Sequence, residues 1–311
     1  MEFVVSHSET GLRLDLLLVR RVPEVSRAGV RRLIERGMVR VNGRIRSKGN
    51  PVREGDRITL EQRPAKNMVS AIADRNLKLQ VCFEDAYLVV VEKPAGIASH
   101  PLRPGELGSA AAALLARYPE MAEVGYHPRE PGLVHRLDND TSGLLLAARN
   151  QTTFEKLRIA LKTHQIDKRY IALCRGELTA PLRIEAKLAV SRRGRRVVKV
   201  VADAHPKGRY AVTEILESEA KAGFSLVQIR VFSAVRHQIR AHLAARGHPL
   251  AGDTLYRGPR VAGLGRQFLH ASELRFNHPE TGGLIHVSSP LPPELSRVLF
   301  DLGGRPSKTI Q

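Results

Sequence analysis

A run of apolar residues at helical spacing is the first clear pattern along the chain. Val30, Leu33 and Ile34 stand at positions i, i+3 and i+4, which places all three on one face of a helix. Ser26 precedes them as a hydroxyl N-cap, and Gly37 follows where the chain must turn away. The spacing therefore predicts a helix between these two residues, with one face buried.

After this helix the pattern changes to alternation of apolar and polar positions. Residues 38–60 alternate around an Asn-Gly pair at 42–43 and a Glu-Gly-Asp turn at 54–56. Such a pattern is typical of short strands joined by tight turns. A small module, with the helix first and the ribbon after it, is expected at the N-terminus.

From residue 81 onward, strand-like and helix-like segments follow one another. Their order is too irregular for a doubly wound parallel sheet, and no internal repeat of fixed period is present. The pattern predicts an α+β domain. The expected strands are 81–92, 144–148, 168–176 and 225–232, and the expected helices are 108–118, 150–162 and 235–247.

Length and composition set the domain organisation. The chain has 311 residues, of which 42% are hydrophobic, and this is enough for two domains with a packed core. Residues after Pro64 lack a sustained period. We expect a module over 1–65, a linker over 66–80, a larger domain over 81–302 and a disordered tail over 303–311.

The chain is strongly basic, with 50 Lys and Arg against 31 Asp and Glu and a net charge of +19. This excess favours a polyanionic partner, and nucleic acid is preferred over a membrane because no basic interfacial helix is evident. No signal peptide or membrane span is expected. Cys82 and Cys174 have no paired spacing, which argues against a disulfide framework. We expect a cytoplasmic monomer.

A polar loop, His-Arg-Leu-Asp-Asn-Asp-Thr-Ser-Gly at residues 135–143, lies between two apolar runs. Loops held by rigid strands commonly display reactive groups, and Asp138 is the candidate here. The alternative is a turn aspartate whose carboxylate caps the amide of Thr141 or Ser142. Charge and composition leave both interpretations open.

Several cofactor and metal chemistries lack their sequence patterns. Neither the glycine-rich loop and Asp-Phe-Gly of kinases, nor a P-loop, nor a Gly-x-Gly-x-x-Gly after a strand occurs. His237 and His242 stand five apart, off the i, i+4 face that a helical metal-binding pair needs. No cofactor and no metal are expected.

The N-terminal module resembles a known RNA-binding fold. Its segments SRA, LIERGMVRVNG and EGD are similar to the S4 module found on many RNA-modifying enzymes. The resemblance implies that the helix carrying Arg27, Arg31 and Arg32 lies against RNA backbone and contacts phosphates. Arg27 and Arg31 stand four apart, and their repulsion also favours an anionic partner. The alternative is a solvated helix with ordinary surface arginines.

The larger domain resembles the RluA-type pseudouridine synthases. The segment HRLDNDTSGLLLAA is similar to their signature, and EDAYLVVVEKPAGIASHP, KRYIAL, HQIRAHLAARGHPLAGDTLY and FLHASELRFNHP match further blocks in order. With the N-terminal module, the likeness covers roughly residues 12–300. It implies a mixed, mainly antiparallel sheet in the catalytic domain and a cofactor-free isomerisation of uridine in RNA.

The resemblance also implies roles for individual residues. Asp138 is the carboxylate that attacks the sugar or base, or stabilises positive charge at the anomeric carbon. Arg240 is the neighbouring cation that favours its ionised form. Tyr170 stacks on the uracil and assists removal of the proton on carbon five. Arg136 contacts RNA and holds the place of the flipped nucleotide.

One segment departs from the family pattern. Where many members have Thr-Gly-Arg-Thr before His-Gln-Ile-Arg, this chain has Ser233, Ala234, Val235 and Arg236. Arg236 is expected to supply the lost charge from a different angle. Together with His237 it is expected to contact RNA.

These observations predict an RNA pseudouridine synthase that flips its target uridine out of the stack. Large-subunit ribosomal RNA is favoured over tRNA, because family members with an S4 module often act there. One alternative is a non-catalytic RNA-binding or ribosome-assembly factor with the same fold. A second is a hydrolase of the N-glycosidic bond that uses Asp138 and Asp140 as its carboxylate pair.

Overall fold

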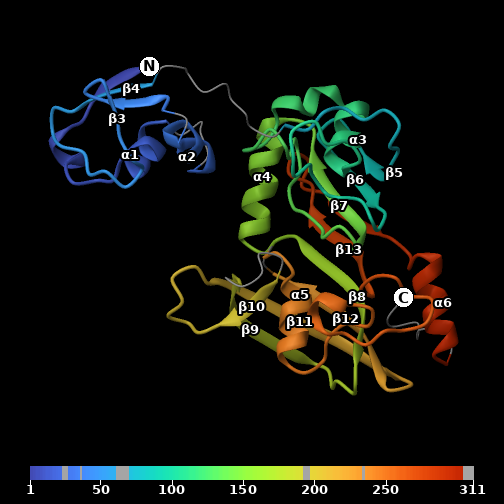
Figure 1. Ribbon diagram of the computed structural model, residues 1–311. Helices are drawn as coiled ribbons and strands as arrows, with labels where there is room; N and C mark the ends of the chain where they lie inside the picture. The colour runs from blue at the N-terminus through green and yellow to red at the C-terminus, as the bar shows by residue number, and fades with distance from the viewer. Residues whose placement is uncertain (23–26, 36, 61–69, 192–196, 233–234, 304–311) are drawn as a thin grey trace. The chain divides into compact units, whose positions relative to one another are not determined.

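The chain divides into two compact units, Met1–Val69 and Ser70–Gln311 (Figure 1). The computed structural model describes residues 1–22, 27–35, 37–60, 70–191, 197–232 and 235–303. Within these ranges, no helix combines the length and the apolar character that crossing a membrane requires.

The first unit packs two helices against a four-stranded antiparallel sheet. Leu14, Leu17 and Leu18 lie on one face of the first helix and are buried, and Val30 and Ile34 of the second helix join the same core. The spacing that predicts the second helix is therefore the face that this helix buries. The elements are α1 (Leu14–Arg21), α2 (Arg27–Glu35) and the 3₁₀ turn η1 (His7–Glu9), with strands in the order β1 (Glu2–Val4), β4 (Arg57–Leu60), β2 (Val39–Val41) and β3 (Arg44–Ile45).

The ribbon after α2 has the turn that its sequence predicts. Asn42 and Gly43 join β2 to β3, and their φ angles of 51° and 73° are those of a tight hairpin turn. Helix α1 and strand β1 are not among the elements predicted from the sequence. The expected N-cap, Ser26, lies outside the described residues.

The second unit is built on one large sheet. Among its described strands, every pairing is antiparallel except the one between β7 and β13. The prediction of an α+β fold with a mainly antiparallel sheet is confirmed. The strand order is β10 (Val198–Val201), β9 (Leu182–Val190), β11 (Arg209–Lys221), β12 (Phe224–Val231), β8 (Asp167–Arg175), β13 (Leu269–Asn277), β7 (Ser142–Ala148), β6 (Leu88–Lys93) and β5 (Gln80–Glu84), and β14 (Leu284–Ser288) pairs with β13.

Strand β7 is buried on both faces. Leu145 packs into one hydrophobic core of the unit and Leu144 into another. Burial on both sides explains why this segment is a continuous apolar run rather than an alternating one. At its start, Gly143 has a φ of 115°, and a Cβ there would lie 2.2 Å from the carbonyl oxygen of Ala271 on β13. Glycine is what allows the two backbones to pair so closely.

Helices cover both faces of this sheet (Figure 1). Leu114 of α3 packs into the core that contains Leu145, and Leu157 of α4 packs into the core that contains Leu144. The side chain of Asn150 caps α4 by accepting from the amide of Thr153 (2.9 Å). The bounds are α3 (Ala110–Arg117), α4 (Gln151–Lys162), α5 (Gln238–Ala245) and α6 (Pro293–Asp301), with 3₁₀ turns η2 (Pro119–Glu123) and η3 (Thr254–Tyr256).

The expected linker over 66–80 differs from the observed division of the chain. Residues 70–80 belong to the second unit, where Ala71 is buried in the core and its amide donates to the Pro128 carbonyl (2.9 Å). Asp74 is also buried, and its carboxylate accepts from the amide of Gly108 (3.0 Å). These contacts attach residues 70–80, whose apolar positions follow neither helical nor strand spacing, to the second unit. The rest of the expected linker, and the expected tail after residue 303, lie outside the described residues.

Candidate active site

The loop before β7 carries Asp138 and is anchored on both sides of it. The Leu137 amide donates to the hydroxyl oxygen of Ser99 (3.0 Å), and the same hydroxyl donates to the Leu137 carbonyl (2.8 Å). On the other side, Arg266 donates to the Asp140 carbonyl (3.0 Å). These bonds fix the backbone from which the Asp138 side chain projects.

Lys93, at the end of β6, supports the same loop. It is fully buried, and its Nζ donates to the carbonyl oxygens of Pro94 (2.8 Å), Ile97 (2.7 Å) and Asn139 (2.9 Å). Burial lowers the pKa of this ammonium group to about 7, while the carboxylate of Asp140 opposes the shift. Three carbonyl acceptors match the three donors of an ammonium group, so these hydrogen bonds satisfy Lys93 while it is protonated.

The carboxylate of Asp138 faces a cation rather than a backbone amide. Arg240 on α5 donates from Nη1 to Asp138 Oδ2 (3.0 Å), and the two side chains are 8% and 17% exposed. The Thr141 amide donates to the backbone carbonyl of Asp138 (3.1 Å), so the turn is closed without the carboxylate. This arrangement differs from the turn-capping alternative, in which the side chain would satisfy that amide.

A second carboxylate holds Arg240 from the other side. Asp253, only 1% exposed, accepts from the Arg240 Nε (2.7 Å) and Nη2 (2.8 Å). Burial alone would lower the pKa of the Arg240 guanidinium, but the hydrogen bonds and negative charges of Asp253 and Asp138 together outweigh burial and raise it. The ring of Tyr256 lies 5.1 Å from the same guanidinium. Arg240 is therefore a charged, rigidly oriented donor.

His237 lies beside this ion pair at the start of α5. Its Nε2 is 3.8 Å from Asp138 Oδ2, and its Nδ1 is 3.0 Å from the hydroxyl of Tyr256. Burial lowers the pKa of the imidazole to about 4, although the carboxylate of Asp138 acts in the opposite direction. The ring is therefore neutral at neutral pH.

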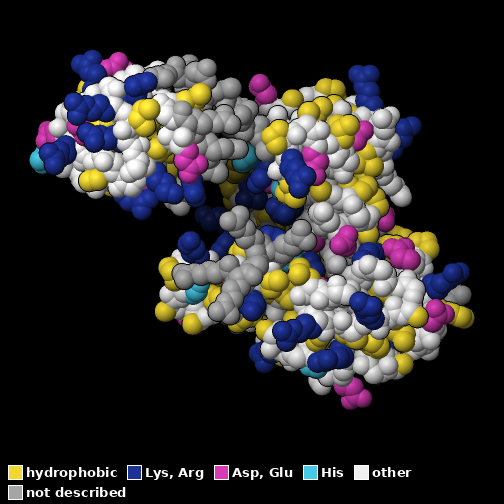
Figure 2. Space-filling model, viewed as in Figure 1, with side chains coloured by type: hydrophobic (Ala, Val, Ile, Leu, Met, Phe, Trp, Pro, Cys, Tyr) yellow, Lys and Arg dark blue, Asp and Glu magenta, His cyan; other side chains and the backbone are white. Residues whose placement is uncertain are grey.

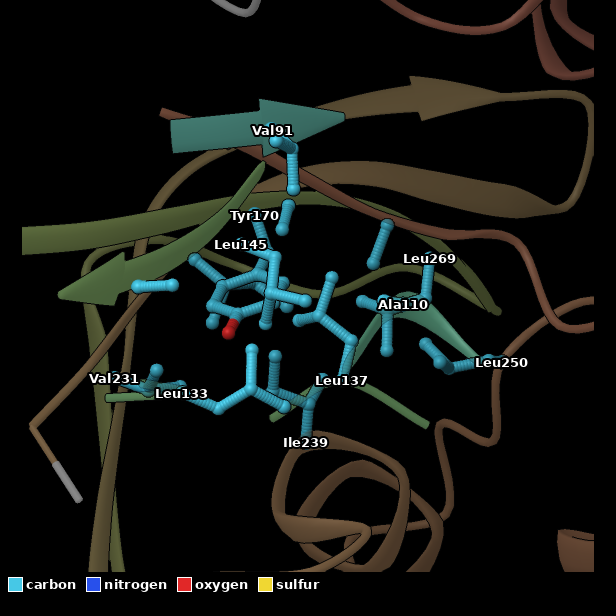
Figure 3. Packing of buried hydrophobic residues seen from close by; sticks show 14 of the residues in the cluster. Val91, Ala110, Leu133, Leu137, Leu145, Tyr170, Val231, Ile239, Leu250 and Leu269 are labelled. Carbon is cyan, nitrogen blue, oxygen red and sulfur yellow. The ribbon is translucent and has the colours of Figure 1, made fainter. Parts of the chain in front are cut away.

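Tyr170 on β8 forms an apolar wall of the site. Its ring is buried among apolar side chains, including Leu133, Val231 and Ile239 (Figure 3). Burial raises the pKa of its phenol, and the negative charge of Asp138 raises it further. The phenol therefore keeps its proton at neutral pH and offers an aromatic face rather than a base.

The two arginines of the larger domain that are predicted to contact RNA line the same pocket as the Asp138–Arg240 ion pair. Arg136 is exposed, and its Nη1 is 3.4 Å from Nε2 of His100. Arg236 is also exposed, and its Nε donates to His237 Nε2 (3.4 Å). Ser233 and Ala234, which open the departure from the family pattern, lie outside the described residues.

One pocket brings the predicted residues of the larger domain together. It is hollowed between the Asp138 loop, β8 and the start of α5. Lys168, which precedes Tyr170 by two residues on β8, joins its lining and is buried. The predicted residues that line it are Arg136, Asp138, Tyr170, Arg236, His237 and Arg240.

The predicted RNA-binding residues of the first unit lie on α2. Arg31 is exposed and donates from Nε to Glu35 (2.8 Å), four residues further along the helix. This acid was not considered in the sequence analysis, and it offsets part of the repulsion between Arg27 and Arg31. The side chains of Arg27 and Arg32 are outside the described part of the structure. Figure 2 shows Lys and Arg side chains spread over the visible face of this unit.

Sequence reasoning missed several residues of the site, among them Ser99, Asp253 and Tyr256. Asp253 and Tyr256 stand within a matched block, but no spacing rule links them to Arg240 or His237. Ser99 stands in another matched block, and its bonds to Leu137 depend on a contact between residues 38 apart in the chain. Its place in the same matched block as Arg240 was the available signal for Asp253.

Two known families match the chain. Residues 87–245 match the family described as RNA pseudouridylate synthase, and residues 12–58 match the S4 domain. A solved structure titled Human RNA Pseudouridylate Synthase Domain Containing 1 is similar with a TM-score of 0.54 and 26% identity, covering 71% of this chain and 87% of that one.

Relatives of similar length match nearly the whole chain. A protein of Chloroflexus aurantiacus named as an uncharacterized RNA pseudouridine synthase is 38% identical over 98% of this chain and 94% of its own. A ribosomal large subunit pseudouridine synthase D of Haemophilus ducreyi is 32% identical, over 95% and 92%. A ribosomal large subunit pseudouridine synthase C of Yersinia pestis is 34% identical, over 96% and 94%.

Proposed function

The chain belongs to the RNA pseudouridylate synthase family, and from that premise we propose that it isomerises specific uridines of large-subunit ribosomal RNA with Asp138 as the essential carboxylate. That it is an RNA pseudouridine synthase with an S4 domain confirms the prediction from sequence. The observation that carries the proposed mechanism is the buried Arg240, which donates to Asp138 in the pocket that Tyr170 also lines.

The names of relatives and the charge of the chain support ribosomal RNA as substrate. Two relatives that align over nearly the whole chain are named large-subunit pseudouridine synthases. A net charge of +19 suits a partner with many phosphates, and the S4 domain adds a second basic surface. In this proposal the S4 domain supplies phosphate contacts, and the pocket selects the uridine.

The proposed reaction replaces the bond between uracil N1 and ribose C1′ by a bond between uracil C5 and C1′. A carboxylate assists by attacking the nucleoside or by stabilising positive charge that develops at C1′. Asp138 suits this role because its position is fixed by the anchored loop and its charge is stabilised by Arg240. Atoms and electrons are conserved overall, so the reaction requires no cofactor.

Base flipping is the proposed route by which uracil reaches Asp138. The carboxylate is only 17% exposed inside a pocket, so a base stacked within RNA would lie too far away to react. Tyr170 offers an aromatic side chain in that pocket, and aromatic stacking commonly holds unstacked bases. In the proposal, exposed Arg136 contacts the RNA at the place that the nucleotide leaves.

Tritium release from C5-labelled uridine tests the proposal, with bulk ribosomal RNA and tRNA as separate substrates. We expect the wild type to release tritium from ribosomal RNA and Asp138→Asn to release none, while both bind RNA equally. Asp140→Asn is the matched control, because it changes an exposed carboxylate in the same loop and should retain activity.

Each alternative gives a different result in this assay. A non-catalytic binding factor would release no tritium from any RNA, including unfinished ribosomal particles. A glycosidic hydrolase would yield free uracil, and Asp140→Asn would then reduce the rate. Release from tRNA but not from ribosomal RNA would contradict the proposed substrate while leaving the reaction intact.

A further inference from the structure

His237 has a left-handed backbone conformation. Its φ of 54° and ψ of 23° lie in the left-handed region, directly before the first residue of α5. A residue other than glycine pays about 1–3 kcal/mol of strain in such a conformation, and strain of this kind gathers at functional sites. The conformation brings the imidazole into the pocket, where the side chain is only 8% exposed.

Two neighbours define which nitrogen of His237 carries the proton. The Tyr256 hydroxyl donates its one proton to the Val198 carbonyl (3.0 Å), so it accepts from His237 Nδ1 at 3.0 Å. Arg236 can only donate, and its Nε points to His237 Nε2 at 3.4 Å. Both contacts place the proton on Nδ1, and the lone pair of Nε2 accepts from Arg236 beside the Asp138 carboxylate oxygen at 3.8 Å.

This lone pair lies at the reaction centre. Nε2 is 3.8 Å from Asp138 Oδ2, and it lines the same pocket as the ring of Tyr170. A base bound between Tyr170 and Asp138 therefore has the unprotonated nitrogen of His237 as a neighbour. The low pKa of the imidazole, about 4, keeps that nitrogen free of a proton at neutral pH.

The proposed reaction needs a proton acceptor at this point. Once C5 of uracil is bonded to C1′, it still carries its hydrogen, which must leave before pseudouridine is complete. Tyr170 was expected from the family resemblance to assist, but its phenol keeps its proton, since burial raises its pKa. Asp138 has its Oδ2 engaged by Arg240.

We propose that Nε2 of His237 is the general base that removes the proton from C5. This assignment rests on the proposed function of the pocket and extends it. The C5–H bond breaks and its proton passes to Nε2. Its electron pair forms the C5–C6 double bond, and the pair of the N1–C6 double bond moves to N1, which takes up a proton from water. The imidazolium then returns its proton to solvent.

The test uses the full-length protein and RNA that carries either hydrogen or deuterium at C5 of uridine. His237→Asn is the main variant, because asparagine tolerates a left-handed backbone but cannot accept a proton. Loss of a general base typically costs ~10²–10⁴-fold in rate, and we expect a decrease in kcat of that order with unchanged RNA affinity. The matched control is His248→Asn, a half-buried histidine just beyond α5 that does not line the pocket, which should react like the wild type.

The isotope effect separates proton removal from positioning. If His237 is the base, C5–H cleavage limits the rate of His237→Asn, and its deuterium isotope effect exceeds that of the wild type. In His237→Gly, which keeps the backbone conformation, added imidazole should restore part of the rate. Activity close to wild type, or a lower rate with an unchanged isotope effect and no rescue, would overturn the assignment. Failure of the proposed function is distinguishable, because the wild type itself would then release no label from C5.

Discussion

Replacement of Asp253 by alanine tests the network of two carboxylates and one arginine most directly. Asp253 is 1% exposed and Arg240 is 8% exposed, and two hydrogen bonds of 2.7 and 2.8 Å join them. Asp253→Ala leaves Arg240 buried with one of its two carboxylate partners. It also frees the guanidinium to rotate, so that Nη1 no longer has a fixed direction toward Asp138.

The size of the effect follows from this burial. Removing one partner of a buried ion pair costs roughly 3–5 kcal/mol, because the other charge stays buried without full compensation. An exposed pair at helical i, i+4 spacing contributes little to stability, because solvent and salt screen the two charges. Arg31 and Glu35 form such a pair, with side chains 60% and 53% exposed. Glu35→Ala is therefore the control, for which stability should stay close to that of the wild type.

Urea unfolding followed by circular dichroism measures both variants, and tritium release measures their activity. We expect Asp253→Ala to lose several kcal/mol of unfolding free energy in the second unit and most of its kcat, with little change in RNA affinity. Glu35→Ala should match the wild type in stability and kcat. A loss of stability below about 1 kcal/mol for Asp253→Ala would refute the argument that a buried charge depends on this carboxylate.

Two further predictions concern residues next to the site, Gly143 and Lys93. Gly143→Ala should destabilise the second unit by at least ~1–3 kcal/mol in urea unfolding, since its Cβ would lie 2.2 Å from the Ala271 carbonyl oxygen, whereas Gly265→Ala has open space and should be near neutral. Burial lowers the pKa of Lys93 from 10.5 to about 7, so between these values the unfolded chain binds more protons than the native protein, and stability should rise with pH across this window. Lys93→Met should abolish that rise, and an equal rise in both proteins would contradict the assignment.

Local patterns predicted the elements whose signals lie in neighbouring residues. The i, i+3, i+4 spacing of Val30, Leu33 and Ile34 predicted α2, and the Asn-Gly pair predicted the β2–β3 turn. Helix α1 buries Leu14, Leu17 and Leu18 at the same spacing. Its other positions include further apolar residues, Leu16 and Val19, so the sequence does not show a single apolar face. Its N-cap residue makes no side-chain hydrogen bond, so the usual start signal is missing as well.

Family motifs predicted which residues meet in the pocket, because each motif contains its own functional residue. Asp138, Tyr170 and Arg240 come from three separate motifs, and all line one pocket. What holds these residues depends on contacts across the fold. The proton position on His237 depends on Tyr256, which is 19 residues away in sequence and whose hydroxyl is occupied by Val198. No spacing in the sequence carries that information.

The parallel pairing of β7 with β13 has a consequence for how the protein is made. Ser142 and His270, which pair across these strands and share a hydrogen bond of 2.9 Å, are 128 residues apart. During translation β7 emerges long before β13. The edge of β7 that pairs with β13 therefore stays unpaired in the growing chain. Pairings between distant segments form slowly, and open apolar edges promote aggregation. A nascent or truncated chain that ends before Leu269 therefore contains the whole Asp138 loop but lacks the strand that closes the sheet beside it.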